Sequence, residues 1–460
     1  MNEQAMDTEQ WDVVVIGGGP SGSSTAAALA RDGRRVTVLE RTESFPRYKV
    51  GESIVPYTYR IAEKIGVLDK LCAAGFVHKQ GFNFLSKSGK LTHPYFFRQS
   101  IKDPLAITWS VERDVFDQLL LDHAAESGAV VRRGARVERV LRDGEQVVGV
   151  EWVDREGQRR EARAAVVVDA TGRGALMGRE FGLRERDPKL DQLAVWRYMK
   201  GAYKQPGESA GNIVVALLAP RGWFWWIPMA NDVTSIGVVT SASHLRSIGA
   251  TPAEQFDRAL QLNPALVEWT RAGTWETEYF VTGDYSYTCS RKAGDGWVAV
   301  GDAGGFIDPV FSPGVFLAMS SAVLAADAIT AALDADDCSA SAFADYEQLY
   351  RRGESTFRIF LDAFYDPLFS AGRFFKDHPH WISEWGRVLQ GDVYGDNRKF
   401  NDFIMTYRFK LAWEAGVEPD IYLPPGWRED HLAPEAERVR DPFEFATSWR
   451  DRECLQTSVA

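Results

Sequence analysis

The feature that most constrains this chain is an apolar run that passes directly into glycines, Val13-Val14-Val15-Ile16-Gly17-Gly18-Gly19-Pro20-Ser21-Gly22. An alanine-rich stretch follows, so the pattern predicts a buried strand, a tight turn and a helix. Gly17, Gly19 and Gly22 stand at GxGxxG spacing, which permits the turn, a close backbone approach to a pyrophosphate, and close helix–strand packing. The segment therefore predicts a Rossmann-type parallel sheet with a dinucleotide phosphate at the helix N-terminus.

A second apolar run at residues 35–39 ends at Glu40, 18 residues after Gly22. An acidic side chain at this point would accept hydrogen bonds from ribose hydroxyls and would repel a 2′-phosphate. A glycine turn in an unrelated α/β protein is the alternative interpretation. The strand before the glycines and the helix after them favour the nucleotide.

Composition excludes several other classes of protein. The chain has 460 residues, a net charge of -11 and a sequence pI of about 5.3, which argues against a nucleic-acid partner. No leader and no membrane-length apolar run is visible, and the four cysteines lack metal spacing, so we expect a cytoplasmic protein without a metal site.

Alternating patterns predict how the chain is divided. We expect a nucleotide-binding domain over residues 10–190, a helix at 57–73, and strands near 76–110 that belong to the next domain. An antiparallel sheet over 191–290 forms this second, substrate domain. Residues 291–335 return to the first domain, and residues 336–460 are mainly helical and cap the substrate pocket.

Three further segments distinguish FAD from NAD as the nucleotide. Residues 165–172 and Gly301-Asp302 each end an apolar run, and Arg113 lies in a predicted helix at 111–126. With the glycine turn, these segments resemble the glutathione-reductase-type flavoproteins, and within them the aromatic hydroxylase and halogenase branch. The resemblance implies an α/β fold with a glutathione-reductase-type FAD-binding Rossmann domain, an inserted antiparallel-sheet substrate domain and a mainly helical C-terminal region.

The same resemblance implies roles for single residues. Asp302 would bind the ribityl chain, Arg113 would reach the phosphate side, and backbone near Val137 would border the adenine; Ser21 and Arg41 would also contact the cofactor. Two alternatives stay open. Asp302 can serve as a helix N-cap as well, and Arg113 can be an ordinary surface ion-pair residue.

The segment Gly222-Trp223-Phe224-Trp225-Trp226-Ile227-Pro228 narrows the chemistry. It matches the GWxWxIP signature of the flavin-dependent halogenases at every fixed position, and this resemblance implies a catalytic part for Trp223 and Trp225. An aromatic strand that packs a sheet face is the alternative interpretation.

Lys79, in Gly75-Phe-Val-His-Lys79-Gln-Gly-Phe-Asn-Phe84, stands where the halogenase family places its essential lysine. The resemblance implies that reduced FAD, oxygen and halide give hypohalous acid. Lys79 would then hydrogen-bond this acid or form a haloamine, and direct the halogen to an electron-rich ring. A partly desolvated ammonium would have a lowered pKa, which helps both roles. A solvent-facing strand lysine is the alternative.

A third segment, Phe306-Ile-Asp-Pro309-Val-Phe-Ser312-Pro-Gly314-Val315, resembles the family's FxxPxxSxG. The resemblance places Gly314 and Val315 beside the flavin and Ser312 and Gly314 at a chloride or bromide. Pro313 departs from the usual Ser or Thr and has no N–H to give the halide. Phe311 stands where free-tryptophan halogenases carry a glutamate, which indicates the phenol and pyrrole branch.

These features predict a flavin-dependent halogenase of secondary metabolism, such as antibiotic biosynthesis. Its reduced FAD would come from a separate flavin reductase, because no second nucleotide fingerprint is visible. The aromatic substrate would be free or tethered to a carrier protein, and the enzyme a monomer or homodimer without a membrane span. The alternatives are an aromatic hydroxylase, a reductase of polyprenyl chains, and a catalytically silent flavin-binding or assembly protein.

Overall fold

The computed structural model describes residues 8–101, 106–187, 191–219, 222–283 and 286–422. Its first sheet has the strand order β19-β20-β10-β1-β2-β7, with β8 and β9 continuing from β10. Its members are β1 (Thr8–Ile16), β2 (Val36–Glu40), β7 (Val130–Arg133), β8 (Arg136–Asp143), β9 (Gln146–Val153), β10 (Arg159–Asp169), β19 (Ala293–Gly294) and β20 (Trp297–Ala299). Strands β7, β2, β1, β10 and β20 run parallel, so the predicted return to this sheet near residue 300 is confirmed.

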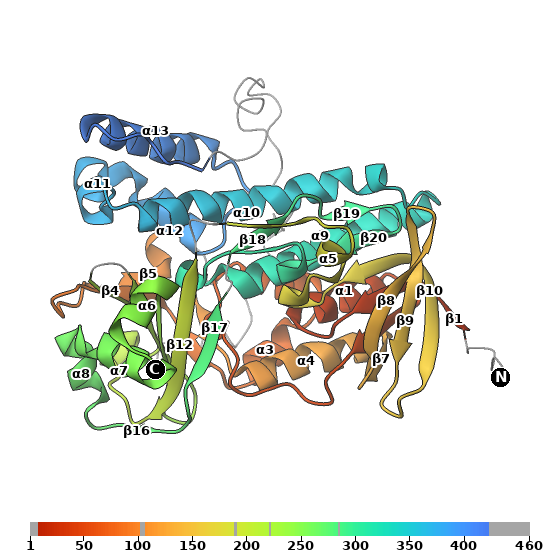
Figure 1. Ribbon diagram of the computed structural model, residues 1–460, viewed down its shortest axis with the longest axis horizontal. Coiled ribbons are helices and arrows are strands. Elements are labelled where there is room, and N and C mark those ends of the chain that lie inside the picture. The colour runs from red at the N-terminus through yellow and green to blue at the C-terminus, as the bar shows by residue number, and fades with distance from the viewer. Residues whose placement is uncertain (1–7, 102–105, 188–190, 220–221, 284–285, 423–460) are drawn as a thin grey trace.

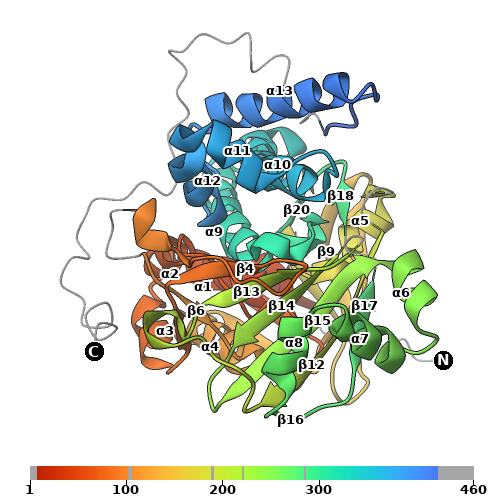
Figure 2. The same ribbon diagram turned by 90° about the vertical axis from the view of Figure 1, so that its left-hand side faces the viewer.

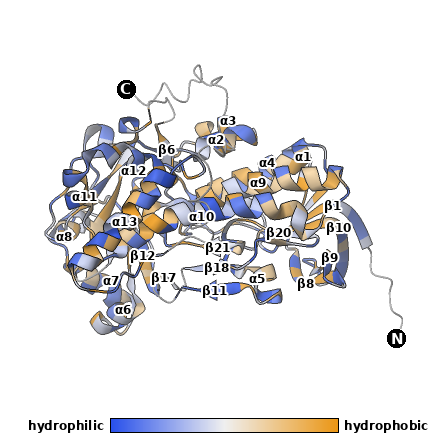
Figure 3. Cartoon of the chain, turned by 90° about the horizontal axis from the view of Figure 1, so that it is seen from above, coloured by the Kyte–Doolittle hydropathy of each residue, from blue (hydrophilic) through white to orange (hydrophobic). Residues whose placement is uncertain are grey.

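Three long helices pack beside the first sheet: α1 (Pro20–Arg31), α4 (Arg113–Glu126) and α9 (Pro313–Asp334). Helix α1 lies between α4 and α9 and contacts both (Figure 1). The apolar residues gather in α1, α9 and the strands beside them (Figure 3). By length and composition α9 could cross a membrane, but it is mostly buried between α1 and the C-terminal helices, as a core helix is.

A second sheet has the order β16-β12-β15-β14-β13-β4-β5, with β17 also on β12. Its members are β4 (Gly81–Leu85), β5 (Tyr95–Phe96), β12 (Gln192–Lys200), β13 (Ile213–Leu217), β14 (Trp223–Pro228), β15 (Val233–Ser241), β16 (Thr274–Trp275) and β17 (Phe280–Gly283). The pairs are antiparallel as predicted, except that β13 and β4 run parallel. One face is covered by α6 (Ala242–Ile248), α7 (Pro252–Gln261) and α8 (Pro264–Thr270).

Residues 57–85 differ in detail from what the sequence predicts. The single helix predicted at 57–73 is two helices, α2 (Thr58–Lys64) and α3 (Leu68–Ala73), because Gly66 between them takes a φ of +79° that breaks the helix. Residues 76–85, at the start of the strands predicted near 76–110, form two strands that are separated at Gln80. The first, β3 (Val77–Lys79), pairs with β6 (Thr108–Ser110) in a separate small sheet, while the second is β4.

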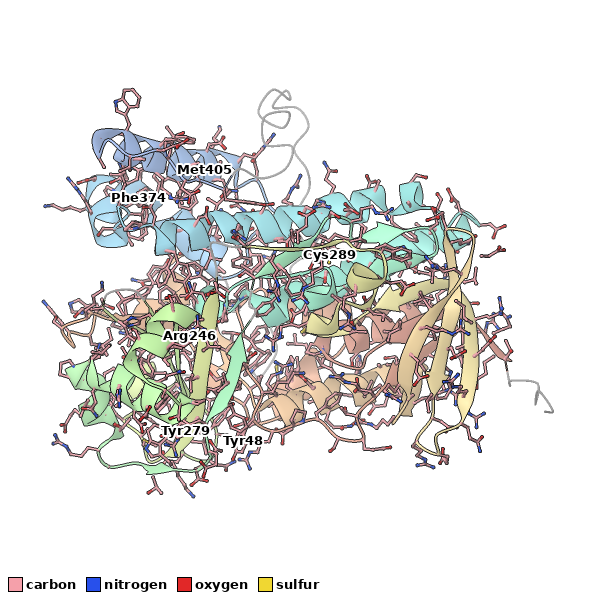
Figure 4. The ribbon with its side chains drawn as sticks, viewed as in Figure 1. Tyr48, Arg246, Tyr279, Cys289, Phe374 and Met405 are labelled. Atoms are coloured by element: carbon pink, nitrogen blue, oxygen red, sulfur yellow. The ribbon has the colours of Figure 1, made fainter. Side chains whose placement is uncertain are left out.

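The described C-terminal region forms a helical layer of α10 (Ala344–Tyr365), α11 (Ala371–Asp377), α12 (Ile382–Leu389) and α13 (Arg398–Glu414). Helix α10 runs along both sheets, and α11 to α13 stack above the second one (Figures 1 and 2). Phe374 of α11 and Met405 of α13 are buried between these helices (Figure 4). The mainly helical character predicted for residues 336–460 is confirmed for the described part, and residues 423–460 lie outside it.

The remaining short elements complete the connection between the sheets. Strands β11 (Arg184–Arg186), β18 (Tyr287–Cys289) and β21 (Gly305–Phe306) form a small sheet, and α5 (Leu176–Glu180) follows β10. The predicted fold class is therefore confirmed: a mixed α/β fold with a parallel Rossmann-type sheet, a mainly antiparallel second sheet and a helical C-terminal region.

Candidate active site

A cavity of about 870 Å³ lies where the two sheets meet. One wall comes from the ends of β1, β2 and β10, and the other comes from the second sheet and includes Trp196, Trp225 and Phe280. Tyr48, from the segment after β2, also lines the cavity, and its ring centroid lies 4.3 Å from that of Tyr198 on β12 (Figure 4). The cavity thus joins a nucleotide-type edge to an aromatic wall.

The glycine turn at residues 17–22 has the geometry that its spacing predicts. Gly17 has a φ of +104°, and a Cβ there would lie 2.5 Å from the Ala170 carbonyl oxygen. A Cβ on Gly22 would lie 1.9 Å from the Gly17 oxygen, so helix and strand could not pack as they do. A Cβ on Gly19 would meet no protein atom within 4 Å, because this residue faces the cavity. Space beside a helix N-terminus suits a phosphate.

Glu40 is held at the end of β2 with its carboxylate in the cavity wall. One oxygen accepts a hydrogen bond of 2.6 Å from the Gly18 N–H, and the other accepts two of 2.8 Å from Thr42. A carboxylate has about four acceptor positions, so a ribose hydroxyl could still be bound. Ser21, Arg41 and Val137 line the same cavity.

Asp302 and Arg113 both line the cavity, Asp302 from the turn after β20 and Arg113 from the start of α4. Burial raises the pKa of the Asp302 carboxyl to about 6, although the charges of Arg173, Arg113 and Lys49 oppose the rise. Arg113 is buried and donates to both oxygens of Asp117, at 2.8 and 2.9 Å, and to the Val50 carbonyl. The alternative that Arg113 is a surface ion-pair residue is therefore wrong, since its ion pair is internal.

The loop before α9 brings Ser312, Gly314 and Val315 to the cavity. Ser312 has a left-handed φ of +57°, and Pro313 occupies the first helical position, where a missing N–H costs least. A Cβ on Gly314 would meet no protein atom within 4 Å. Phe311 packs edge-on against Phe364 of α10, with ring centroids 5.6 Å apart.

Lys79 does not line the cavity, but it lies one side chain away from it. It is 2% exposed, and its Nζ donates a hydrogen bond of 2.8 Å to Ser53 Oγ. The Ser312 hydroxyl donates to the same oxygen at 3.0 Å, and both serines line the cavity. Burial lowers the pKa of Lys79 to about 7. The alternative of a solvent-facing lysine is therefore wrong.

Trp223 and Trp225 are buried in β14, and both line the cavity. Trp225 Nε1 donates to Ser235 Oγ at 3.1 Å, and Trp223 Nε1 donates to the Tyr365 hydroxyl at 2.9 Å. Tyr365, the last residue of α10, donates in turn to Asp308 Oδ2 at 2.9 Å. Burial raises the pKa of Asp308 to about 7. These contacts tie the tryptophan strand to the C-terminal helices and to the loop before α9.

The cavity therefore brings together all the site residues expected from the sequence except Gly22, which is packed behind the turn, and Lys79. Four polar residues at the site were missed: Glu52, Ser53, Asp308 and Tyr365. Burial raises the pKa of Glu52, which lines the cavity, to about 7. A signal for the first two was present, because Lys49-Val50-Gly51-Glu52-Ser53 clusters polar residues around a glycine. Tyr365 lies in an aromatic run, residues 357–375, whose spacing fits core packing as well as a cap over the pocket. Within the described residues, no cluster of His, Cys, Asp or Glu could hold a metal ion.

Comparison with known proteins agrees with this geometry. A family model described as an FAD binding domain matches residues 10–348. The 1H-pyrrole-2-carbonyl-[peptidyl-carrier protein] chlorinase of Pseudomonas fluorescens is 34% identical over 419 residues, which cover 85% of this chain and 92% of that protein.

Two solved structures are similar over most of this chain. The flavin-dependent brominase Bmp2 has a TM-score of 0.77 and 28% identity, covering 87% of this chain and all of its own. A flavoprotein/dehydrogenase from Cytophaga hutchinsonii has a TM-score of 0.80 and 28% identity, covering 88% of this chain and all of its own.

Proposed function

Because the chain belongs to the flavin-dependent halogenase family, we propose that it halogenates an electron-rich aromatic ring with hypohalous acid that Lys79 directs. One observation carries this proposal. The buried Lys79 amine reaches the cavity wall through Ser53, whose hydroxyl also accepts from Ser312. Burying an amine costs free energy of folding, because the charged form loses its water. A chemical role for the Lys79 amine explains this cost better than a role in packing does.

The cavity residues fit FAD. Gly19 leaves room at the α1 N-terminus, where Ser21 also lies, Glu40 keeps an acceptor position, and the half-buried Asp302 lines the wall. We assign the phosphates to the glycine turn and Arg113, the ribose to Glu40 with Arg41 nearby, the adenine to the backbone at Val137, and the ribityl chain to Asp302. Gly314 and Val315 would border the ring system. Reduced FAD, together with oxygen and halide, supplies hypohalous acid when it is bound.

The halide would be held by Ser312 and Gly314. Pro313 removes one of the two backbone donors expected from the family, and the structural reason is that it begins α9. The Gly314 N–H is the backbone donor that this loop can still offer, and the Ser312 hydroxyl can donate to the halide when it turns away from Ser53. We therefore expect halide binding to depend strongly on the Ser312 hydroxyl.

Lys79 would act as a hydrogen-bond donor in its ammonium form. One of its three N–H groups is given to Ser53, which leaves two that can bind the oxygen of hypohalous acid. This bond draws electrons from the oxygen–halogen bond, so the ring carbon attacks the halogen and the oxygen leaves as water with the ring proton. Hypohalous acid and an aromatic C–H thus give an aryl halide and water.

Trp223 and Trp225 would separate the substrate from the flavin side of the cavity. Their indole N–H groups are held by Tyr365 and Ser235, so the two rings form a fixed wall. A fixed apolar wall keeps the oxidant on the path to Lys79 and keeps the aromatic ring away from the place where the oxidant is formed. This would favour halogenation over hydroxylation.

The substrate that we propose is a phenol or a pyrrole, and among these a pyrrole carried by a peptidyl carrier protein. The chlorinase from Pseudomonas fluorescens is named for such a pyrrole-2-carbonyl group, and Phe311 with Phe364 gives this loop an apolar neighbour instead of a charged one. A separate flavin reductase would supply the reduced FAD.

A turnover assay tests the proposal. The enzyme is mixed with reduced FAD, oxygen and either chloride or bromide, and with pyrrole-2-carbonyl carrier protein or a free phenol, and products are read by mass spectrometry. We expect a halide-dependent mass shift. Hydroxylated product that ignores halide would identify an aromatic hydroxylase instead.

The matched variant is Lys79→Met, which keeps the side-chain length without the charge. We expect halogenation to fall by at least about 100-fold while reduced FAD is still oxidised and peroxide is still released. Halogenation that survives this change would remove Lys79 from the mechanism.

A second candidate function has one observation in its favour, the likeness to a protein named flavoprotein/dehydrogenase. A reductase of polyprenyl chains would oxidise reduced FAD with an alkene under anaerobic conditions. An anaerobic mixture of the protein, reduced FAD and a polyprenyl alkene should therefore stay reduced if the halogenase proposal is right.

A further inference from the structure

We infer that Ser53 is a positioning residue that holds the Lys79 amine at the wall of the flavin cavity. This inference rests on the proposed function and adds to it a residue that no family motif quoted above contains. Ser53 lies between the amine and the cavity: its Oγ is 2.8 Å from Lys79 Nζ and 3.0 Å from Ser312 Oγ.

The backbone fixes Ser53 independently of these side-chain contacts. Ser53 forms an isolated antiparallel bridge with Ser110 on β6. On either side of it, the Val111 N–H donates to the Glu52 carbonyl and the Ile54 N–H donates to the Trp109 carbonyl. Lys79 is paired with Thr108 on the same strand. Both partners of the Lys79–Ser53 contact are therefore aligned on β6, and their separation is set by strand geometry.

The hydrogen-bonding capacity of Ser53 explains what it does. A hydroxyl has two lone pairs and one hydrogen. Both lone pairs are used, by Lys79 and by Ser312, so the hydrogen is left for a third partner. Because Ser53 lines the cavity, a molecule that leaves the flavin side can accept this hydrogen before it meets the amine.

Two further hydroxyls show that the space beside Lys79 is polar. Thr108 Oγ1 and Ser110 Oγ are buried, and neither has a hydrogen-bond partner among the described residues. Thr108 is directly opposite Lys79 in the β3–β6 pair, so the two side chains leave the sheet on the same face. Buried hydroxyls without partners are costly, and a small polar guest such as hypohalous acid would satisfy them.

Loss of the Ser53 hydroxyl should therefore let oxidant escape. The test compares Ser53→Ala with Ser53→Thr, which keeps a hydroxyl, in full-length enzyme with reduced FAD, oxygen, bromide and substrate. Excess taurine in solution traps the hypobromous acid that leaves the protein. The quantity measured is the ratio of brominated substrate to bromotaurine.

We expect Ser53→Ala to lower this ratio about tenfold or more and Ser53→Thr to restore most of it. Ser286→Ala is the control for the loss of a buried serine hydroxyl, because Ser286 is buried, its Oγ has no partner among the described residues, and it lies outside the cavity wall. An unchanged ratio in Ser53→Ala would overturn the inference.

A second measurement does not depend on halogenation. The Lys79 amine is titrated by NMR in protein labelled with ¹⁵N at the lysine side chains, with the Lys79→Met spectrum used to assign its signal. A hydrogen bond from the ammonium to Ser53 favours the charged form, so Ser53→Ala should lower the measured pKa further, and Ser53→Thr should not. An identical lysine pKa in Ser53→Ala would overturn the inference that the Lys79 ammonium is hydrogen-bonded to Ser53. A wild-type enzyme that never halogenates, yet shows this shift, would instead reject only the proposed function.

Discussion

The two ends of the cavity are built in opposite ways. The nucleotide end takes Gly17, Gly19 and Glu40 from one short stretch of chain, and it presents mainly backbone. The Lys79 end takes its groups from distant stretches: Ser53 is 26 residues from Lys79 and 259 residues from Ser312, and Trp223 is 142 residues from Tyr365. At this end the hydrogen bonds are formed by side-chain hydroxyls, an amine and a carboxyl.

This difference teaches where each end is vulnerable. A backbone turn fails when an added atom has nowhere to go, so its weakness is steric. A set of buried polar side chains fails when one member loses its partner or changes its charge, so its weakness is electrostatic. The first end should tolerate changes of pH and the second should not.

The largest effect on FAD binding is expected at the glycine turn, where two alanine substitutions distinguish a loss of packing from a loss of FAD affinity. Gly22→Ala places a Cβ 1.9 Å from the Gly17 oxygen, so we expect a loss of about 2–3 kcal/mol of stability together with FAD binding. Gly19→Ala meets no protein atom within 4 Å, so it should fold normally and lose FAD affinity by at least about tenfold. Thermal unfolding and FAD titration measure the two. Equal stability loss in both variants would contradict the steric interpretation.

Lys79→Met should make the protein more stable at pH 7, although it should end halogenation. The lysine pKa falls from 10.5 in the unfolded chain to about 7 in the folded protein. Between these values the unfolded chain binds more protons, so the folded state loses stability as pH falls from 10.5 to 7. Removing the amine should return up to about 4 kcal/mol at pH 7 and almost nothing near pH 11. Chemical denaturation at both pH values checks this, and a loss of stability at pH 7 would count against a destabilising amine.

Halogenation should fall as pH rises above about 7. The proposed donor is the ammonium form of Lys79, which is present below its pKa of about 7 and lost above it, about tenfold for each pH unit. Lys79→Arg is the control, because a guanidinium stays charged and should give a lower but flat profile between pH 7 and 9. Initial rates with saturating halide measure this. A wild-type rate that rises over the same range would favour haloamine formation by the neutral amine.

The smallest effect is expected at Tyr365. Tyr365→Phe leaves the Trp223 N–H without its acceptor and the Asp308 carboxyl without one donor, which should cost about 1–2 kcal/mol. Halogenation should fall a few-fold while FAD affinity is kept. Tyr407→Phe is the control, since Tyr407 packs its ring against Phe369 and Phe374 in the same helical layer. Similar losses in both variants would show that the Tyr365 hydroxyl has no special part.

Much of the nucleotide end could be predicted from the sequence, and the reason is physical. The geometry of Gly17 and Gly22 is set by neighbours in the same turn, so the spacing of the glycines carries it. The parallel return to the first sheet was likewise visible as an apolar run that ends at Gly301-Asp302. Helix-breaking at Gly66 was missed because the apolar period continues across it, and only the left-handed φ reveals the break.

The Lys79 end could be predicted only in part. A family resemblance pointed to Lys79, Trp223 and Trp225, but no local pattern could show that Lys79 is buried or that Ser53 touches it. Strand β3 reads as one piece with β4, and the partner that buries the lysine, β6, lies almost thirty residues further on. Whether Arg113 lies on the surface or inside could not be predicted for the same reason, because its burial depends on which distant segments pack over it.

The pairing order of the first sheet also sets a timetable for synthesis. Strand β1 pairs with β10, and β10 pairs with β20, so the first sheet stays incomplete until residue 299 has left the ribosome. Tyr365, which accepts the hydrogen bond from Trp223, is translated later still. Long parallel crossovers close slowly, and domains form in the order in which they are made. The first sheet can therefore close before Tyr365 has been translated, and the docking of α10 onto β14 is the last step that completes the cavity wall.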